Sequence, residues 1–529
     1  MTGEVKTNQL AVKELRPWAV YLVCLAIALV FLFLFGLDSP LHTFNPHCDY
    51  QWFTTMGRGI LAGKVPYRDL FEQKGPMIFV LFAVANLLPE PQIVIWCCEV
   101  LLISLFLYFC YRIARKFLSP WLSLLVVPLM MMLLSMNKVR GLEGACVEEY
   151  CLPIFAYGLL CFLDFLLERK AVTWRRGLAL GICIGILFWT KFTLLEFFII
   201  PLLIWAVVNL VEHKFLMVVR SALMMLLGMV IVTLPIIIWF AVVNALGDLW
   251  QVYFVINFSN YSGDVQNGVR ITRVNPWVNL KQSLLFTGTG FLLIQVLGLI
   301  CFTVFNWRKN SGWQLLIAVL GTWLMIGFFC GYLYYYLPLY TYAVIGVIYL
   351  VKGIGYVWTA MKLNVKPLVK ALFLVILSAM SLVLALPFVS NLKEINRPRN
   401  QYAPLVVADM IAEYNQTVEK PATLFCYRMV DCGFYNAASV VPNVRYYAQN
   451  SFTEAELPEM FASFDDTIRN QLCDFVIMYR FTYEIKRDFI ANYYHPYVDN
   501  NVMKSSLLFA AFEPNGYVKN EIVILFRND

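Results

Sequence analysis

Residues 18–37 read WAVYLVCLAIALVFLFLFGL, a run without a charged side chain. An α-helix needs about 20 predominantly apolar residues to cross the hydrocarbon core of a bilayer. Comparable runs recur as far as residue 387, and the chain of 529 residues is 60% hydrophobic and 14% charged. Since soluble globular proteins carry about 25% charged residues, the sequence excludes an ordinary soluble enzyme and predicts a polytopic α-helical membrane protein.

Eleven apolar runs are predicted to span the membrane. They are residues 18–37, 93–111, 121–135, 150–167, 177–190, 193–211, 221–243, 284–305, 313–330, 333–351 and 367–387. Lys and Arg gather in alternate connections, so the positive-inside rule places these connections and the N-terminus in the cytoplasm. The odd number of spans then places residues 388–529 outside. The basic net charge of +7 is explained by orientation and lipid headgroups, and no nucleic-acid partner is expected.

Residues 38–92 form one long outer loop in this prediction. Its apolar segment 75–88 is too short for an ordinary span and ends at Pro89-Glu90-Pro91, which favours a re-entrant or interfacial helix. Residues 52–62 are expected to form a helix lying on the membrane surface. The membrane module is therefore residues 1–387, with interfacial helices in its first outer loop.

The hydrophobic pattern changes near residue 404. Helices are predicted for residues 405–418 and 454–471, and strands for ATLFCY (422–427), CDFVIMY (473–479), SLLFAAF (506–512) and EIVILF (521–526). Alternation of helix and strand signals is typical of an α/β fold. Residues 388–529 are thus predicted to form an extracytoplasmic α/β domain.

The first outer loop contains HTFNPHCDYQWFTTMGRGILAGKVPYRDLFEQKGP at residues 42–76. It resembles the corresponding loop of the GT-C superfamily of integral-membrane glycosyltransferases, in particular the branch of protein O-mannosyltransferases and the lipid A aminoarabinose transferase. Those proteins show an acidic residue after the first span, a G-x-x-Y-x-D-like stretch, and Lys-Pro-Pro before a short interfacial helix. The counterparts here are Asp49, residues 63–69 ending in Asp69, and Lys74-Gly75-Pro76.

Three further features agree with the resemblance, which covers most of the chain through residue 387. They are Glu148 and Glu149 at the start of the fourth span, Thr190-Lys191 where the fifth span surfaces, and Tyr335-Tyr336-Leu337-Pro338 in a late span. The chain also departs from the family pattern. Gln73 replaces an acid, Gly75 replaces the first proline, and Tyr334 stands where an arginine is common.

The resemblance implies a GT-C-like fold and transfer of a sugar from a polyprenyl-phosphate donor to a cell-envelope acceptor, which is a lipid, a polysaccharide or a teichoic-acid-like polymer. A leaving phosphate at the membrane interface needs cations, for which Lys74 and Lys191 are the candidates, with Tyr335 beside them. A carboxylate can deprotonate the acceptor, and Asp49 is the candidate base. One base acting in a single displacement predicts inversion at the anomeric carbon.

Three acids, Glu148, Glu149 and Asp69, could orient the acceptor or bind a metal. A divalent cation is compatible with the sequence but not required by it. Simpler explanations exist for several residues, because acids at a helix start suit the helix dipole and a lysine near a helix end can reach the interface on its own. Tyr335 could belong to the aromatic belt.

Two other functions are compatible with a polytopic membrane protein. A transporter or flippase of lipid-linked sugars would show paired repeats and mid-membrane charges, whereas the charges here gather beside the outer loop and no repeat is seen. A scaffold in envelope assembly would leave the run KVPYRDLFEQKGP (64–76) unexplained.

Overall fold

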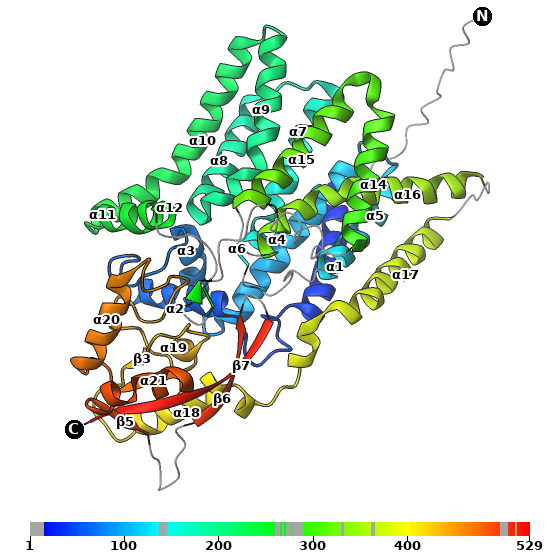
Figure 1. Cartoon of the computed structure of the whole chain (residues 1–529). Helices are drawn as coiled ribbons and strands as arrows, with labels where there is room; N and C mark the ends of the chain where they lie inside the picture. The colour runs from blue at the N-terminus through cyan, green and yellow to red at the C-terminus, as the bar shows by residue number, and fades with distance from the viewer. Residues whose placement is uncertain are drawn as a thin grey trace, which may run out of the picture.

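The computed structural model describes residues 15–136, 144, 146–259, 265–266, 269–270, 277, 289–329, 333–360, 366–497, 506–513 and 516–528. Its first part is a bundle of helices, and its last part is a sheet with helices at one end of the bundle (Figure 1). Helices α2 and α3 lie between these two parts (Figure 1). This arrangement places the motif loop, residues 62–75 between α2 and α3, at the junction.

The helices before residue 260 are α1 (Pro17–Phe35), α2 (Cys48–Leu61), α3 (Pro76–Ala85), α4 (Pro91–Ala114), α5 (Pro120–Ser135), α6 (Val147–Tyr150), α7 (Leu152–Glu168), α8 (Trp174–Thr190), η1 (Phe192–Leu195), α9 (Glu196–Val211), α10 (Phe215–Val242), α11 (Leu246–Leu249), η2 (Trp250–Ile256) and α12 (Asn257–Ser259). A short hairpin follows, made of β1 (Val265–Gln266) and β2 (Val269–Arg270). The bundle continues with α14 (Thr289–Phe305), η3 (Trp307–Lys309), α15 (Ser311–Phe329), η4 (Leu333–Tyr342), α16 (Ala343–Ala360) and α17 (Pro367–Ala385).

Six segments of the described chain are long and apolar enough to cross a membrane. They are Pro17–Phe35, Pro91–Ala114, Phe192–Val211, Phe215–Val242, Tyr334–Trp358 and Pro367–Phe388. Shorter apolar helices are Pro76–Ala85, Pro120–Ser135, Leu246–Ile256, Phe291–Phe305 and Ser311–Gly327. The chain is thus a multi-helix protein with membrane-spanning segments, and the count of eleven spans stays a prediction.

Two predicted segments can be compared with the described helices. A helix was predicted for residues 52–62, and α2 covers nearly all of this stretch and buries most of its side chains, including Trp52 and Phe53. It packs on α3 and on α19 (Phe434–Ala437) of the C-terminal region, and its position at the membrane surface stays a prediction. The predicted span 333–351 is confirmed as part of an apolar segment long enough to cross a membrane, Tyr334–Trp358. It begins with a 3-10 segment around Pro338, and its α-helix starts only at Ala343.

Glycines allow several helices of the bundle to approach closely. A Cβ at Gly181 of α8 would lie 2.0 Å from the carbonyl oxygen of Met225 in α10, and one at Gly228 of α10 would lie 2.3 Å from the oxygen of Leu178. At Gly346 of α16 the nearest oxygen, that of Ile294, would be 1.9 Å away. Small residues at helix interfaces of membrane proteins permit this close backbone packing.

The C-terminal region, residues 388–529, is built around a five-stranded sheet. Its strands are β3 (Leu424–Cys426), β4 (Phe475–Tyr479), β5 (Tyr494–Pro496), β6 (Ser506–Glu513) and β7 (Gly516–Arg527). The 3-10 helix η5 (Leu386–Phe388) leads into it from α17, and its helices are η6 (Ser390–Glu394), η7 (Arg399–Gln401), α18 (Ala403–Asn415), α19 (Phe434–Ala437), α20 (Pro458–Arg469) and α21 (Arg480–Ala491). The order is β3-β4-β7-β5, with β6 also paired to β7, and only β3 and β4 run parallel. Strands β3 and β4 are buried on both faces, as expected for continuous apolar strands that are covered on both sides.

We expect Gly181→Ala to lower the free energy of unfolding by about 1–3 kcal/mol, because the new methyl group forces α8 and α10 apart. Gly353→Ala is the matched control, since a Cβ there meets no atom within 4 Å. Thermal unfolding of the purified protein in detergent measures the difference. Equal melting temperatures for the two variants would contradict the close packing of α8 on α10.

Candidate active site

Asp49 and Lys74 form an ion pair between α2 and the motif loop. Asp49 lies in the first turn of α2, where its backbone N–H donates to Nδ1 of the N-cap residue His47 (3.1 Å). Lys74 Nζ lies 3.3 Å from Asp49 Oδ1 and 5.1 Å from the ring centre of Phe53. The side chains of Lys74 and Asp49 are 14% and 24% exposed, so the pair is accessible and yet largely removed from water.

Glu72 is a second carboxylate beside Lys74, and no role was predicted for it from the sequence. Its Oε1 accepts a hydrogen bond from the Lys74 backbone N–H (3.2 Å) and lies 3.6 Å from Lys74 Nζ. Burial raises the pKa of the Glu72 carboxyl, and the charge of Lys74 partly opposes this rise. Its position two residues before a motif lysine was the available signal, but only the fold shows that Glu72 is buried.

The motif loop is held in shape by Tyr67 and Asp69. Tyr67 has a positive φ of 71°, and its hydroxyl donates to the carbonyl oxygen of Lys74 (2.7 Å). Asp69 Oδ2 accepts from the Val65 N–H (2.7 Å), and Asp69 Oδ1 lies 3.0 Å from Arg68 Nε. The hydrogen bond from Arg68 lowers the pKa of Asp69. These contacts place Asp69 in the turn of the loop that presents Lys74.

Gly75 connects the motif loop to the end of α8. Its N–H donates to the carbonyl oxygen of Thr190 (3.0 Å), and a Cβ on Gly75 would lie 2.0 Å from the carbonyl oxygen of Trp189. A proline, which the family pattern has at this position, could not donate this hydrogen bond. Lys74 precedes Gly75 and Lys191 follows Thr190. The contact therefore places the backbones of the two predicted phosphate-binding lysines next to each other.

Lys191 forms the second ion pair of the site. Its Nζ lies 2.6 Å from Glu148 Oε1, and the two side chains are 11% and 1% exposed. The same ammonium group lies 3.4 Å from the ring centre of Tyr335 and 5.0 Å from that of Tyr334. Cation–π contacts of this kind stabilise a desolvated cation. Lys191 therefore contacts both Glu148 and Tyr335, two residues that the sequence singled out separately from it.

Glu149 faces the interior, next to two other acids. Its charge interacts with that of Glu99 in α4, which in turn lies beside Asp38 after α1. All three carboxyl groups are buried, and burial raises the pKa of Asp38. In the part of the chain that the structure describes, no group of three or more His, Cys, Asp and Glu is arranged to hold a metal ion.

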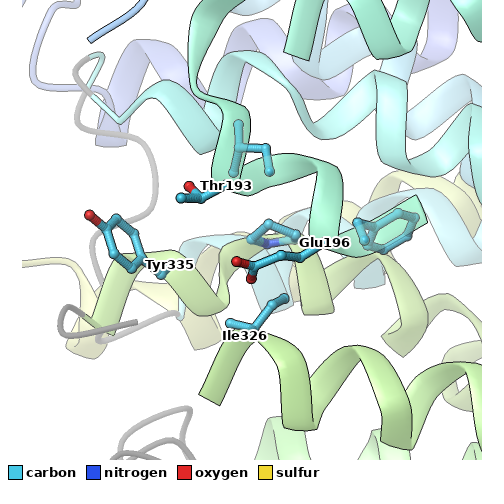
Figure 2. Close-up of a pocket in the computed structure, with 7 residues that line it drawn as sticks. Thr193, Glu196, Ile326 and Tyr335 are labelled. Atoms are coloured by element: carbon cyan, nitrogen blue, oxygen red, sulfur yellow. The ribbon is translucent and has the colours of Figure 1, made fainter. Parts of the chain in front are cut away.

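A small pocket opens beside Tyr335 (Figure 2). Its polar members are Thr193, Glu196 and Tyr335, and the remaining lining residues are Leu194, Phe197, Ile326 and Pro338. Glu196 begins α9, one turn after Lys191. Glu196 was not predicted as a site residue, because a single charge at the start of an apolar run resembles an ordinary helix-terminal residue.

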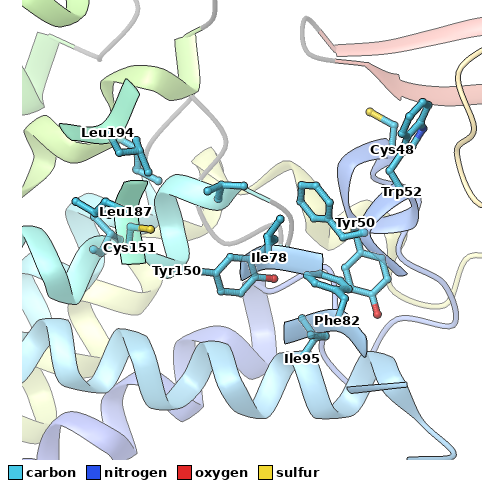
Figure 3. Packing of buried hydrophobic residues seen from close by; sticks show 14 of the residues in the cluster. Cys48, Tyr50, Trp52, Ile78, Phe82, Ile95, Tyr150, Cys151, Leu187 and Leu194 are labelled. Carbon is cyan, nitrogen blue, oxygen red and sulfur yellow. The ribbon is translucent and has the colours of Figure 1, made fainter. Parts of the chain in front are cut away.

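An aromatic cluster packs between the elements that carry the site. The ring centres of Tyr50 and Phe82 are 5.5 Å apart, and those of Phe82 and Tyr150 are 6.4 Å apart (Figure 3). Tyr150 ends α6, the short helix that carries Glu148 and Glu149. The cluster therefore joins α2 and α3, which flank the motif loop, to α6, which carries two of the predicted acids.

We expect Lys191→Met to lower the free energy of unfolding by about 3–5 kcal/mol, because it leaves the Glu148 carboxylate buried without its cation. The double variant Lys191→Met/Glu148→Gln should recover most of this loss. The control is Lys214→Met, whose pair with Glu212 is exposed to solvent, so that its loss should change the stability little. Thermal unfolding in detergent compares them, and a Lys191→Met protein as stable as Lys214→Met would contradict a buried pair.

No family model and no curated protein matches the sequence. Solved structures do match. Apo ArnT from Cupriavidus metallidurans aligns with a TM-score of 0.59 at 13% identity, over 96% of this chain and 97% of that one. The same protein bound to undecaprenyl phosphate aligns with a TM-score of 0.57 at 12% identity, over the same shares of the two chains.

A mycobacterial arabinofuranosyltransferase, AftD, aligns with a TM-score of 0.50 at 11% identity, over 98% of this chain and 40% of the longer one. These likenesses extend over nearly the whole chain, including the C-terminal region. They agree with the family resemblance of the motif loop. The chain therefore has the same overall fold as the ArnT structures.

Proposed function

We propose that this protein is a glycosyltransferase that takes a sugar from a polyprenyl-phosphate donor and attaches it to a cell-envelope lipid, polysaccharide or teichoic-acid-like polymer. The observation that carries the proposal is a set of two largely buried lysine–carboxylate pairs, Lys74–Asp49 and Lys191–Glu148. The Gly75–Thr190 hydrogen bond joins the backbone next to Lys74 to the backbone next to Lys191. A lipid-linked phosphate has the matching chemistry, with an apolar tail and an anionic head.

Lys74 and Lys191 are proposed to bind the donor phosphate. Both ammonium groups are largely withdrawn from water, where a charge is worth more to a developing phosphate anion than it would be in bulk solvent. Tyr335 lies against Lys191 and can donate its hydroxyl to the same phosphate. The structure of ArnT with undecaprenyl phosphate supports a donor of this class for the fold.

Asp49 is proposed as the general base. Before the donor binds, its ion pair with Lys74 favours the ionised carboxylate, the form that can accept a proton. A bound phosphate competes for the Lys74 ammonium and releases Asp49 toward the acceptor hydroxyl or amine. The acceptor oxygen or nitrogen attacks the anomeric carbon, its proton moves to Asp49, and the bond to the phosphate breaks. A single displacement of this kind inverts the anomeric configuration.

The remaining predicted acids have supporting roles in this proposal. Glu148 holds Lys191 in place through their 2.6 Å contact. Asp69 orients the acceptor side of the site through the turn that it forms with Val65. Glu149 fixes α6 through its buried neighbour Glu99. None of these steps requires a metal ion.

We expect Asp49→Asn to lower the transfer rate by about 10²–10⁴-fold, because the amide cannot accept the proton. Lys74→Met should lower it by about 10²–10³-fold through lost stabilisation of the leaving phosphate. The measurement is transfer of labelled sugar by the purified protein from a panel of polyprenyl-phosphate sugars to an envelope extract.

The controls for this assay are Asp409→Asn and Lys214→Met, which change exposed ion pairs in the C-terminal region and in the α9–α10 connection. Both should keep wild-type rates. Full activity of Asp49→Asn would show that Asp49 is not the general base. A wild-type protein that consumes no donor in the panel would favour a transporter of lipid-linked sugars instead.

We also propose that the N-terminus is cytoplasmic and that the C-terminal region forms an extracytoplasmic domain. In a Cys97→Ser background, Asn470→Cys should react with a membrane-impermeant maleimide in intact cells, because Asn470 is exposed on the C-terminal region. Lys214→Cys, in the α9–α10 connection, should react only after permeabilisation. The reverse labelling pattern would overturn the topology.

A further inference from the structure

A loop of the C-terminal region encloses the motif loop. The Phe71 N–H donates to the carbonyl oxygen of Arg445 (2.9 Å). The Phe71 ring lies 4.9 Å from that of Tyr446 and 6.1 Å from that of Phe452, measured between ring centres. Residues 445–452 are therefore packed along the chain that leads to Glu72 and Lys74, although they are more than 350 residues away in sequence.

Asn450 is the residue of this loop that contacts a charged group. Its Nδ2 donates to Glu72 Oε2 (3.2 Å), and its Oδ1 accepts from the Ser451 N–H (2.7 Å). The second hydrogen bond defines which end of the amide faces Ser451. The donor end is thereby directed at the Glu72 carboxylate.

The Glu72 carboxylate lies between Asn450 and Lys74. One oxygen of the carboxylate meets Asn450, and the other faces the backbone N–H and the ammonium group of Lys74. The Glu72 side chain is only 3% exposed, so water cannot replace a lost donor. Hydrogen bonding to a carboxylate favours its charged form, and burial opposes that form. Without Asn450, Glu72 takes up a proton more readily, and Lys74 then loses the charge of this carboxylate neighbour.

We propose that Asn450 is a positioning residue that keeps the Glu72 carboxylate charged and directed at Lys74, so that the C-terminal region completes the phosphate-binding end of the site. The catalytic consequence rests on the proposed function. The reactivity of the Lys74 side chain does not depend on the proposed function, because it can be measured directly on the whole chain. The two parts of the proposal are therefore tested by separate readouts.

The first readout is the reactivity of Lys74 toward acetic anhydride, followed by mass spectrometry of the peptide that contains it. Asn450→Leu keeps a side chain of similar size but has no donor. We expect its Lys74 to react several-fold faster than in the wild type, since an ammonium that has lost a carboxylate partner gives up its proton more easily. Asn492→Leu, which changes an exposed asparagine on the same region, should leave the rate unchanged. Equal Lys74 reactivity in Asn450→Leu and wild type would overturn the proposal.

The second readout is sugar transfer, resolved into kcat and KM. Asn450→Leu should lower kcat several-fold at an unchanged melting temperature. Asn450→Asp is nearly isosteric, so a packing role would leave it fully active, whereas repulsion from Glu72 should lower its kcat as well. The double variant Glu72→Gln/Asn450→Asp should be no less active than Glu72→Gln alone, because the repulsion is gone.

These outcomes separate the two proposals. Full activity of Asn450→Asp, or strictly multiplicative losses in the double variant, would reduce Asn450 to a packing residue. If the wild-type protein transfers no sugar, the proposed function fails, and the Lys74 labelling alone then decides whether Asn450 positions this lysine.

Discussion

The hydrogen bond from the Gly75 amide to the Thr190 carbonyl is the constraint on which the site depends. It joins the motif loop to the point where α8 ends and η1 begins, and it requires a residue without a Cβ at position 75 because the Trp189 carbonyl occupies that space. Lys74 and Lys191 each lie one residue from this bond. The departure from the family's proline at this position is thus a requirement of the local geometry, since proline has no N–H to donate.

The two lysines can remain at the end of an apolar bundle only because each has a carboxylate. A buried ammonium without a partner is costly, and a paired one is tolerated. Lys74 is placed between Asp49 and Glu72, and Lys191 between Glu148 and the Tyr335 ring. Such pairs keep the cations charged and in position before a substrate arrives, which is how preorganised electrostatic sites reduce reorganisation during a reaction. The acids around the lysines therefore maintain the anion-binding character that the proposed donor requires.

Much of the architecture could be predicted from local patterns. Apolar runs that are about long enough to cross a bilayer as helices correspond to α1, α4, α9, α10, α16 and α17. The alternating segments after residue 404 contain α18, β3, α20, β4, β6 and β7. The helix at residues 52–62 was predicted, but not its packing on α3 and α19, because an amphipathic helix that meets protein has the same local pattern as one that lies on lipid. No role was predicted for Glu72 or Asp38 for a similar reason, since nothing in their immediate neighbours shows that they are buried.

The sequence by itself determined the class of protein, the approximate positions of the helices and strands, and the residue types around which a phosphate-binding site could form. These follow from hydrophobic period and from short motifs, both of which act over a few residues. Only the tertiary structure decided which charges are partners. Asp49 meets Lys74, Glu148 meets Lys191, and Asn450 meets Glu72 across 25, 43 and 378 positions of the chain. The energy of an ion pair depends on separation and on exclusion of water, and both are set by how distant segments pack.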